Sequence, residues 1–127
     1  MNKIKYLLIS LLAGSGASHA QQYPVKPVRV IVGFTAGGPS DIVGRIVAAQ
    51  LTERMGRQFV VENRAGASGM IAAEMTAKAP PDGYTLMITP QTSLAVAPAL
   101  YGKAPYDTMR DFTPITLTGY TPLLMVV

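Results

Sequence analysis

Residues 28–41 read VRVIVGFTAGGPSD, and this stretch decides the fold class. Its first seven residues, 28–34, are β-branched and nearly continuous in apolar character, which is typical of a parallel strand buried on both faces. After a glycine-containing loop, Pro39 fits the first position of a helix, where its missing N–H leaves nothing unpaired. Asp41 then lies in the first turn, where the helix dipole favours a carboxylate. The stretch therefore predicts a strand, a loop and a helix.

The predicted helix shows apolar residues at helical spacing, and Gly56 is a natural place for it to end. The expected buried face consists of Ile42, Val43, Ile46, Val47, Leu51 and Met55. The same order of elements then repeats, with segments at 59–62 (strand), 70–79 (helix), 84–89 (strand) and 94–100 (helix), and a turn at 80–83. Strands that alternate with helices over short loops predict an α/β fold with a mainly parallel sheet and flanking helices.

Ligands of such sheets bind beyond the carboxyl ends of the strands. All three strand-to-helix loops are rich in Gly, Ser, Thr, Asn or Gln, so we expect them to form one polar rim. In residues 34–41, exposed N–H groups and close backbone approach at Gly37 and Gly38 suit an anion such as a carboxylate or phosphate. Glycine is also needed for the backbone geometry of a turn alone, so both interpretations stay open.

The composition removes several classes of function. Hydrophobic residues make up 49% of the 127 residues and charged residues 14%, which indicates a folded chain. There is no cysteine, and the single histidine is His19, which excludes disulfides, thiolate metal sites and most histidine-based catalysis. We expect no metal and no cofactor. The basic residues are scattered, which argues against nucleic acid as a partner.

Residues 1–20 are typical of a secretory signal peptide. Lys3 and Lys5 precede an apolar stretch at 6–13, and residues 18–20 (Ser-His-Ala) form a cleavage site. The apolar stretch is far shorter than the ~20 residues that a membrane-spanning helix needs. We expect the leader to be cleaved, the mature chain to begin near Gln21 with no membrane span, and the protein to be periplasmic.

A nucleotide-dependent enzyme with a Rossmann-like fold is the enzymatic alternative. No lysine follows Gly38, so the phosphate loop of a P-loop protein is absent, and the glycines do not fit G-x-G-x-x-G. Glu62 does fall near the end of the second strand, where a ribose-binding acid would lie. The export signal argues against this alternative, because nicotinamide cofactors are not expected outside the cytoplasm.

Four side chains near the predicted rim have two interpretations each. Asp41 is either a catalytic base or, as we favour, a partner of the helix dipole. Arg64 pairs with a ligand carboxylate or, as we favour, with a neighbouring acid on the surface. Tyr101 and Tyr106 are interpreted as packing aromatics rather than as residues that stack on a ligand.

Six short motifs, in register along the mature chain, resemble the Bug family, the periplasmic receptors of tripartite tricarboxylate transporters. They are Tyr23-Pro24-x-Lys26-Pro27, Phe34 to Asp41, Val61-Glu62-Asn63-Arg64-x-Gly66-x-x-Gly69, Pro81-Asp82-Gly83-Tyr84-Thr85-Leu86, Pro105-Tyr106-Asp107 and Asp111-Phe112-x-Pro114. Each motif is weak alone, but six in order are specific. Ser68 stands where members of the family commonly carry glycine, a change that we expect the loop to tolerate.

The resemblance implies a monomeric, non-enzymatic receptor. It has two lobes that close like a clamshell on a small organic carboxylate and deliver it to a membrane permease. Residues 21–127 would be the N-terminal lobe, incomplete and without the second lobe, because members of the family are about twice as long or more. Binding by this chain alone is then expected to be weak or absent, and a non-functional truncated product is a further alternative. Which carboxylate binds is not encoded in this part of the sequence.

Carried over to this chain, the resemblance assigns ligand binding to two loops. The implied binding residues are Phe34, Thr35, Ala36, Gly37, Gly38, Ser40, Asp41, Thr89, Pro90, Gln91, Thr92 and Ser93.

Overall fold

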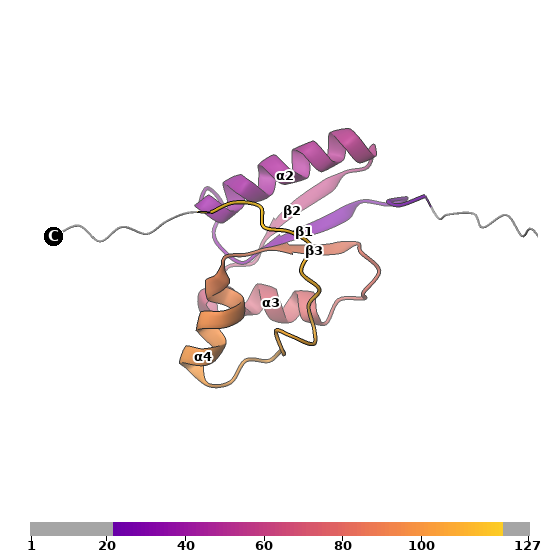
Figure 1. Cartoon of the computed structure of the whole chain (residues 1–127). Helices are drawn as coiled ribbons and strands as arrows, with labels where there is room; N and C mark the ends of the chain where they lie inside the picture. The colour runs from indigo at the N-terminus through magenta and orange to yellow at the C-terminus, as the bar shows by residue number, and fades with distance from the viewer. Residues whose placement is uncertain (1–21, 121–127) are drawn as a thin grey trace, which may run out of the picture.

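The computed structural model describes residues 22–120, in which three parallel strands lie between helices on both faces (Figure 1). The strands are β1 (Val28–Val32), β2 (Phe59–Asn63) and β3 (Thr85–Ile88), in the order β2-β1-β3. Helix α2 (Pro39–Met55) covers one face, and α3 (Met70–Ala77) covers the other, with α4 (Ala97–Tyr101) on the same side as α3. The predicted α/β fold is confirmed. The predicted leader and the last seven residues lie outside the described part.

The central strand β1 is buried on both faces, as its sequence predicted. Val28, Val30 and Val32 are at most 1% exposed, and the first two pack with Ala48 of α2. Ile31 is also fully buried and points to the opposite face, because side chains alternate along a strand. A strand that is apolar on both faces requires a layer of helices on each side, and this requirement fixes the architecture.

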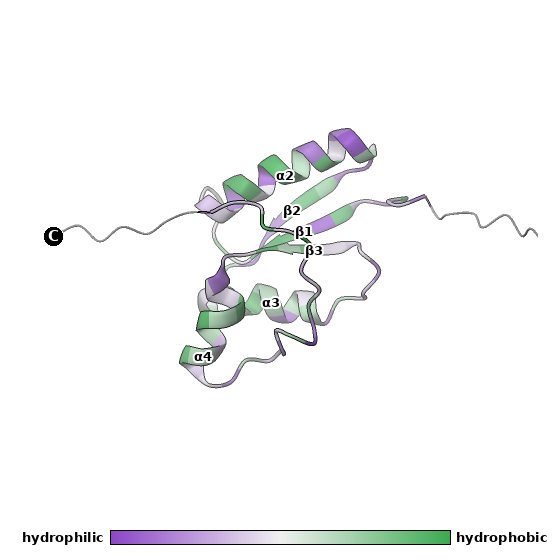
Figure 2. Ribbon diagram, in the orientation of Figure 1, coloured by the Kyte–Doolittle hydropathy of each residue, from purple (hydrophilic) through white to green (hydrophobic). Residues whose placement is uncertain are grey.

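Helix α2 packs on the sheet through small residues and through Leu51, which is one member of the apolar face that we predicted. Gly44 and Ala48 are buried, and a Cβ atom at Gly44 would lie only 3.1 Å from Cγ2 of Val32. The helix backbone therefore lies very close to β1. Part of the predicted face is exposed, namely Ile42, Ile46 and Met55, and part is half-buried, namely Val43, Val47 and Leu51. Hydrophobic and hydrophilic residues alternate along the ribbon of α2 (Figure 2).

The ends of α2 follow their sequence signals, whereas other boundaries shift. Pro39 is the first helical residue, and Gly56 has φ 67° and donates its N–H to Thr52 O at 3.0 Å. The helix predicted at 94–100 begins earlier, with the π-helical turn η2 (Thr92–Val96) that runs into α4. Residues 113–120 have no regular structure and are exposed. Between residues 22 and 120, none of the helices is long and apolar enough to span a membrane.

Two of the family-like motifs meet at the amino ends of the strands. The hydroxyl of Tyr23 donates to Gly83 O at 2.6 Å, and the N–H of Val25 donates to the hydroxyl of Tyr84 at 3.0 Å. Lys26 lies over the Tyr84 ring, 4.3 Å from its centroid. These motifs are about 60 residues apart in sequence and far from the polar rim. Their contacts fasten the incoming chain to β3, which is a structural role.

Candidate functional site

The loops that follow the three strands meet at one edge of the sheet, as the sequence predicted. Val32, at the end of β1, lies beside Asn63 of β2 and Ile88 of β3. Because the strands are parallel, all three loops leave the sheet at the same level. The two loops assigned to the ligand, 34–41 and 89–93, are therefore neighbours.

The loop after β1 presents backbone groups to solvent. Thr35, Ala36 and Gly37 are exposed. The N–H groups of Thr35 and Ala36 make no hydrogen bond to any residue between 22 and 120, whereas the N–H of Gly37 donates to Asp41 Oδ2 at 2.8 Å. The N–H of Gly38 donates to Thr35 O at 3.3 Å, which closes a tight turn. The loop thus holds N–H donors that an anion can reach.

Asp41 supports this loop from inside the protein. It is 2% exposed, and its carboxylate accepts hydrogen bonds from Arg45 Nε at 2.9 Å, the Gly37 N–H and Asn63 Nδ2 at 2.9 Å. The bond from Arg45, followed by those from Gly37 and Asn63, lowers the pKa of Asp41 to about 2. The carboxylate is therefore ionised and occupied by these donors. This arrangement supports a positioning role and speaks against a catalytic base.

The loop after β2 has an unusual backbone. Four successive residues have positive φ, from Gly66 at 140° through Ala67 at 47° and Ser68 at 54° to Gly69 at 87°. The Ser68 carbonyl accepts a hydrogen bond from the hydroxyl of Ser93 at 3.0 Å, which joins this loop to the loop after β3. The left-handed backbone and this hydrogen bond together define the conformation of the loop after β2.

Replacing Ser68 by glycine is expected to stabilise the chain by about 0.5 kcal/mol. A side chain at positive φ strains the backbone, and glycine relieves this strain. The greater entropy of glycine in the unfolded state offsets only part of the gain. The matched control is Ser40→Gly in the first turn of α2, which is expected to destabilise it by about 0.5 kcal/mol. Urea unfolding of both variants checks the opposite signs. Destabilisation by Ser68→Gly would contradict the left-handed backbone at this position.

The loop after β3 is held by hydrogen bonds from a later segment of the chain, residues 105–112. Gln91 and Thr92 are exposed, whereas Ser93 is fully buried. The loop at 105–112 supplies side-chain donors to two carbonyl groups of the π-helical turn that begins here. The hydroxyl of Tyr106 donates to Ser93 O, and that of Thr108 donates to Leu94 O at 2.6 Å. Tyr106 therefore packs in the protein, as the sequence indicated, and its hydroxyl also supports the loop after β3.

The predicted binding residues divide into three groups by exposure. Exposed residues that a ligand can reach are Thr35, Ala36, Gly37, Gln91 and Thr92. Half-buried residues are Phe34, Gly38, Ser40, Thr89 and Pro90. Asp41 and Ser93 are buried, and their side-chain oxygens are engaged within the protein.

The charged residues after β2 pair with one another. Glu62 accepts a hydrogen bond from Arg29 at 2.7 Å and another from Arg64, and these two contacts lower its pKa. Arg64 therefore takes part in a surface ion pair, the interpretation that we favoured. Glu62 is occupied in the same way, so it is not held free for a ribose.

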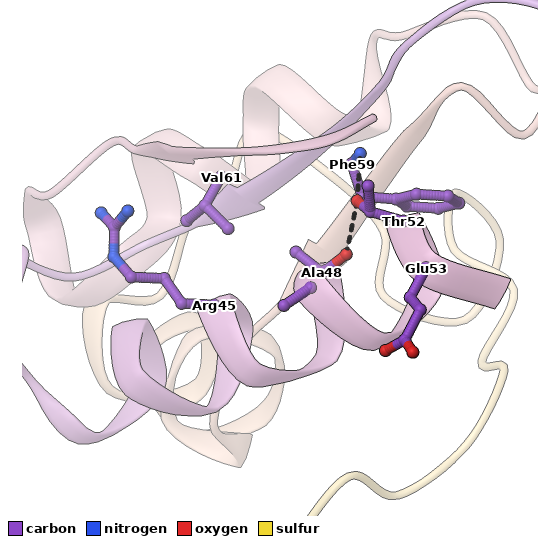
Figure 3. Close-up of a pocket in the computed structure, with 7 residues that line it drawn as sticks. Arg45, Ala48, Thr52, Glu53, Phe59 and Val61 are labelled. Atoms are coloured by element: carbon purple, nitrogen blue, oxygen red, sulfur yellow. Dashed lines mark hydrogen bonds between the residues drawn. The ribbon is translucent and has the colours of Figure 1, made fainter. Parts of the chain in front are cut away.

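A groove of about 490 Å³ lies elsewhere, between α2 and the edge strand β2 (Figure 3). Its lining includes Arg45, Ala48, Thr52, Glu53, Phe59 and Val61. The hydroxyl of Thr52 donates to Ala48 O at 2.8 Å and accepts the N–H of Phe59 at 3.0 Å. The groove is wide open and contains no residue of the two predicted binding loops, so we do not assign the ligand to it.

Comparison with known proteins decides the family. Residues 43–127 match the family described as the tripartite tricarboxylate transporter family receptor. The chain belongs to this family. Its members are periplasmic binding proteins and not enzymes, so the nucleotide-dependent enzyme considered from the sequence is set aside. The resemblance to the Bug family is confirmed.

Individual relatives support the same assignment. Protein BugT of Bordetella pertussis is 40% identical over 108 residues, which cover 84% of this chain and 33% of BugT. MatC from Rhodopseudomonas palustris, solved with bound malate, is 40% identical with a TM-score of 0.69 over 72% of this chain and 31% of MatC. Another R. palustris protein, solved with adipate, is 41% identical with a TM-score of 0.66 over 68% of this chain and 29% of its own. The chain spans about a third of the length of the curated relatives that it matches.

Two residues at the rim were not among the predicted binding residues. Asn63 donates to Asp41 and to Phe34 O at 3.0 Å, and Gly69 lies against Phe34 and Ser93. Both belong to the motif quoted from 61–69. The position of Asn63, directly at the carboxyl end of a strand, was the signal that could have indicated its importance.

Proposed function

We propose that this chain supplies part of a periplasmic receptor that captures a small dicarboxylate for a tripartite tricarboxylate-type transporter. One carboxylate of the ligand would lie between the loop Thr35 to Gly38 and the loop Thr89 to Thr92, where N–H groups and hydroxyls would hold it. The observation that carries the proposal is the convergence of these two exposed, donor-rich loops at the carboxyl edge of the sheet.

The chemistry of the two loops favours an anion held by neutral donors. Residues 33–41 and 89–93 contain no lysine or arginine. Arg45, the nearest cation on α2, is bonded to Asp41. Backbone N–H dipoles fixed in place can stabilise a carboxylate without a counter-charge. The bound malate and adipate of the two R. palustris relatives are both dicarboxylates, which supports this class of ligand.

Export, delivery to a permease and a monomeric state are also part of the proposal, and they are supported by the family and by the sequence of the leader. Residues 1–20 would direct export, and the permease of the transporter would receive the ligand from a monomeric receptor. The described residues form only one wall of the site, and water reaches Thr35, Ala36 and Thr92. We therefore expect this chain alone to bind a dicarboxylate weakly, with a Kd above about 1 mM, which corresponds to a binding free energy of about −4 kcal/mol.

Chemical-shift titration of the ¹⁵N-labelled chain tests the proposal, because it detects millimolar binding and locates it. Malate and adipate are added at constant ionic strength, with sodium chloride and neutral succinamide as ligand controls. The amide signals of Thr35, Ala36 and Thr92 are expected to move in a saturable way with the two acids only. Thr92→Val is expected to weaken binding and Thr52→Val, at the far end of α2, to leave it unchanged.

Two results would count against the proposed function. One is the absence of any saturable shift at the two loops with either acid. The other is a response centred on the groove between α2 and β2, which would move the ligand to a different site.

A further inference from the structure

Asn63 connects both ends of the anion-binding loop. Its Nδ2 donates to Phe34 O at 3.0 Å and to Asp41 Oδ1 at 2.9 Å, and its Oδ1 accepts from Arg45 at 3.2 Å. Phe34 opens the loop after β1, and Asp41 closes it in the first turn of α2. The second oxygen of Asp41 holds the N–H of Gly37, in the middle of the loop. One amide and one carboxylate therefore fix the start, the middle and the end of this loop.

Only an amide satisfies all the partners around this position. Two acceptors, a carbonyl and a carboxylate, face one end of the side chain, and a guanidinium donor faces the other end. An amide offers two N–H donors at one end and a carbonyl acceptor at the other, which matches this arrangement. An aspartate would place an oxygen against the Asp41 carboxylate and the Phe34 carbonyl, with no proton between them at neutral pH.

We propose that Asn63 is a positioning residue of the carboxylate site, which holds the loop Thr35 to Gly38 in the conformation that presents its N–H groups to the ligand. The binding part of this inference rests on the proposed function. The loop-setting part stands on the contacts of Asn63 alone. Asn63 does not touch the ligand in this proposal and acts through Phe34 and Asp41.

A purely structural role would be the simpler explanation, and Thr52 provides the control for it. Like Asn63, Thr52 is a polar residue of this pair of elements, and its hydroxyl joins α2 to β2 by accepting the N–H of Phe59. It lies at the opposite end of the same two elements and contacts neither binding loop. Thr52→Val removes this connection and keeps the volume of the side chain.

The first test is a malate titration of the full chain at pH 7 and constant ionic strength, followed by the amide signals of Thr35 and Ala36. Asn63→Asp is expected to raise the Kd at least tenfold, and Thr52→Val to leave it within twofold of the parent. If Asn63→Asp kept the parent's Kd, or if Thr52→Val weakened binding equally, the positioning role would be overturned.

The second test follows the Gly37 amide signal of the ligand-free chain against pH. In the parent, the pKa of Asp41 is about 2, lowered by Arg45 and the two amides. A lowered pKa means that the ionised form stabilises the fold above pH 4 and that this contribution is lost as the pH falls toward 2. The Gly37 signal of the parent is therefore expected to stay constant from pH 4 to 8.

In Asn63→Asp, we expect the loop contacts to be lost as the pH rises, whereas the parent loses them only in strong acid. The charged groups that face position 63 are Asp41 and Arg45, because Glu62 points to the other face of the sheet and pairs with Arg29. Two carboxylates in contact cannot both ionise freely, so the pKa of one of them rises above its usual value of about 4. The shared proton restores one of the lost bonds in acid. We therefore expect the Gly37 signal of the variant to approach that of the parent near pH 4 and to depart from it as the pH rises.

The two tests separate the failure of this inference from that of the proposed function. If no variant, the parent included, responds to malate, the proposed function falls and takes the binding part of the inference with it. The Gly37 titration still decides the loop-setting part. If that signal in Asn63→Asp matches the parent from pH 4 to 8, the loop does not depend on Asn63, and the inference is wrong whatever the binding result.

Discussion

Replacing Gly69 by alanine is expected to destabilise the chain by about 3 kcal/mol, the combined effect of a strained backbone and an overpacked contact. Gly69 has φ 87°, and a Cβ atom there would lie 2.1 Å from Ser93 Oγ and 3.3 Å from the Phe34 ring. Ser93 is fully buried, and its hydroxyl is already bonded to Ser68 O. Its side chain therefore has no free space to move into. Urea unfolding followed by circular dichroism measures the change.

Two further variants show whether the contact with Ser93 is the reason. Gly56→Ala introduces the same strain at φ 67° with no atom within 4 Å of the new Cβ, so it is expected to destabilise by only about 1 kcal/mol. Adding Ser93→Ala to Gly69→Ala removes the closest clash and is expected to recover part of the loss. If Gly69→Ala and Gly56→Ala were equally destabilising, the close approach of the two loops would be contradicted.

The sequence predicted the frame of this fold because its signals are local. The apolar run at 28–34 fixes β1 as a buried strand, Pro39 marks the start of α2, and Gly56 marks its end. The buried face of α2 was predicted in part wrongly. Counting apolar residues favoured Ile42 and Ile46, whereas the sheet contacts Gly44 and Ala48, because small residues allow the helix to approach β1 closely. Close packing of this kind depends on a partner that periodicity does not reveal.

The candidate site was predicted at the level of loops but not at the level of side chains. The convergence of the loops follows from parallel strands, and parallel strands follow from the order of the elements. Which polar groups face outward depends on contacts between distant residues, such as Asn63 with Phe34 or Ser93 with Ser68. Asp41 was placed correctly near the loop, but its three donors come from both neighbouring and distant positions. No local pattern distinguishes a residue that supports the loop from one that contacts the ligand.

Replacing Tyr106 by alanine is expected to destabilise the chain by about 4 kcal/mol, as is typical for removing a buried aromatic side chain. Tyr106 is 9% exposed, and its ring packs edge-on against Phe112 at a centroid distance of 5.6 Å. Its hydroxyl also donates to the carbonyl of Ser93. Tyr106→Phe keeps the ring and removes this donor, so it is expected to destabilise by about 1 to 2 kcal/mol.

The control for Tyr106 is Tyr101, another tyrosine of the same region. Tyr101 is 57% exposed, and its hydroxyl is 3.5 Å from Ser68 Oγ, which is too far for a strong hydrogen bond. Tyr101→Ala is therefore expected to change the free energy of unfolding by no more than about 0.5 kcal/mol. Equal effects of the two alanine variants would mean that the segment carrying Tyr106 does not support η2. A large effect of Tyr106→Ala with a smaller one of Tyr106→Phe would show that packing of the ring contributes more than its hydroxyl to holding the loop after β3 in place.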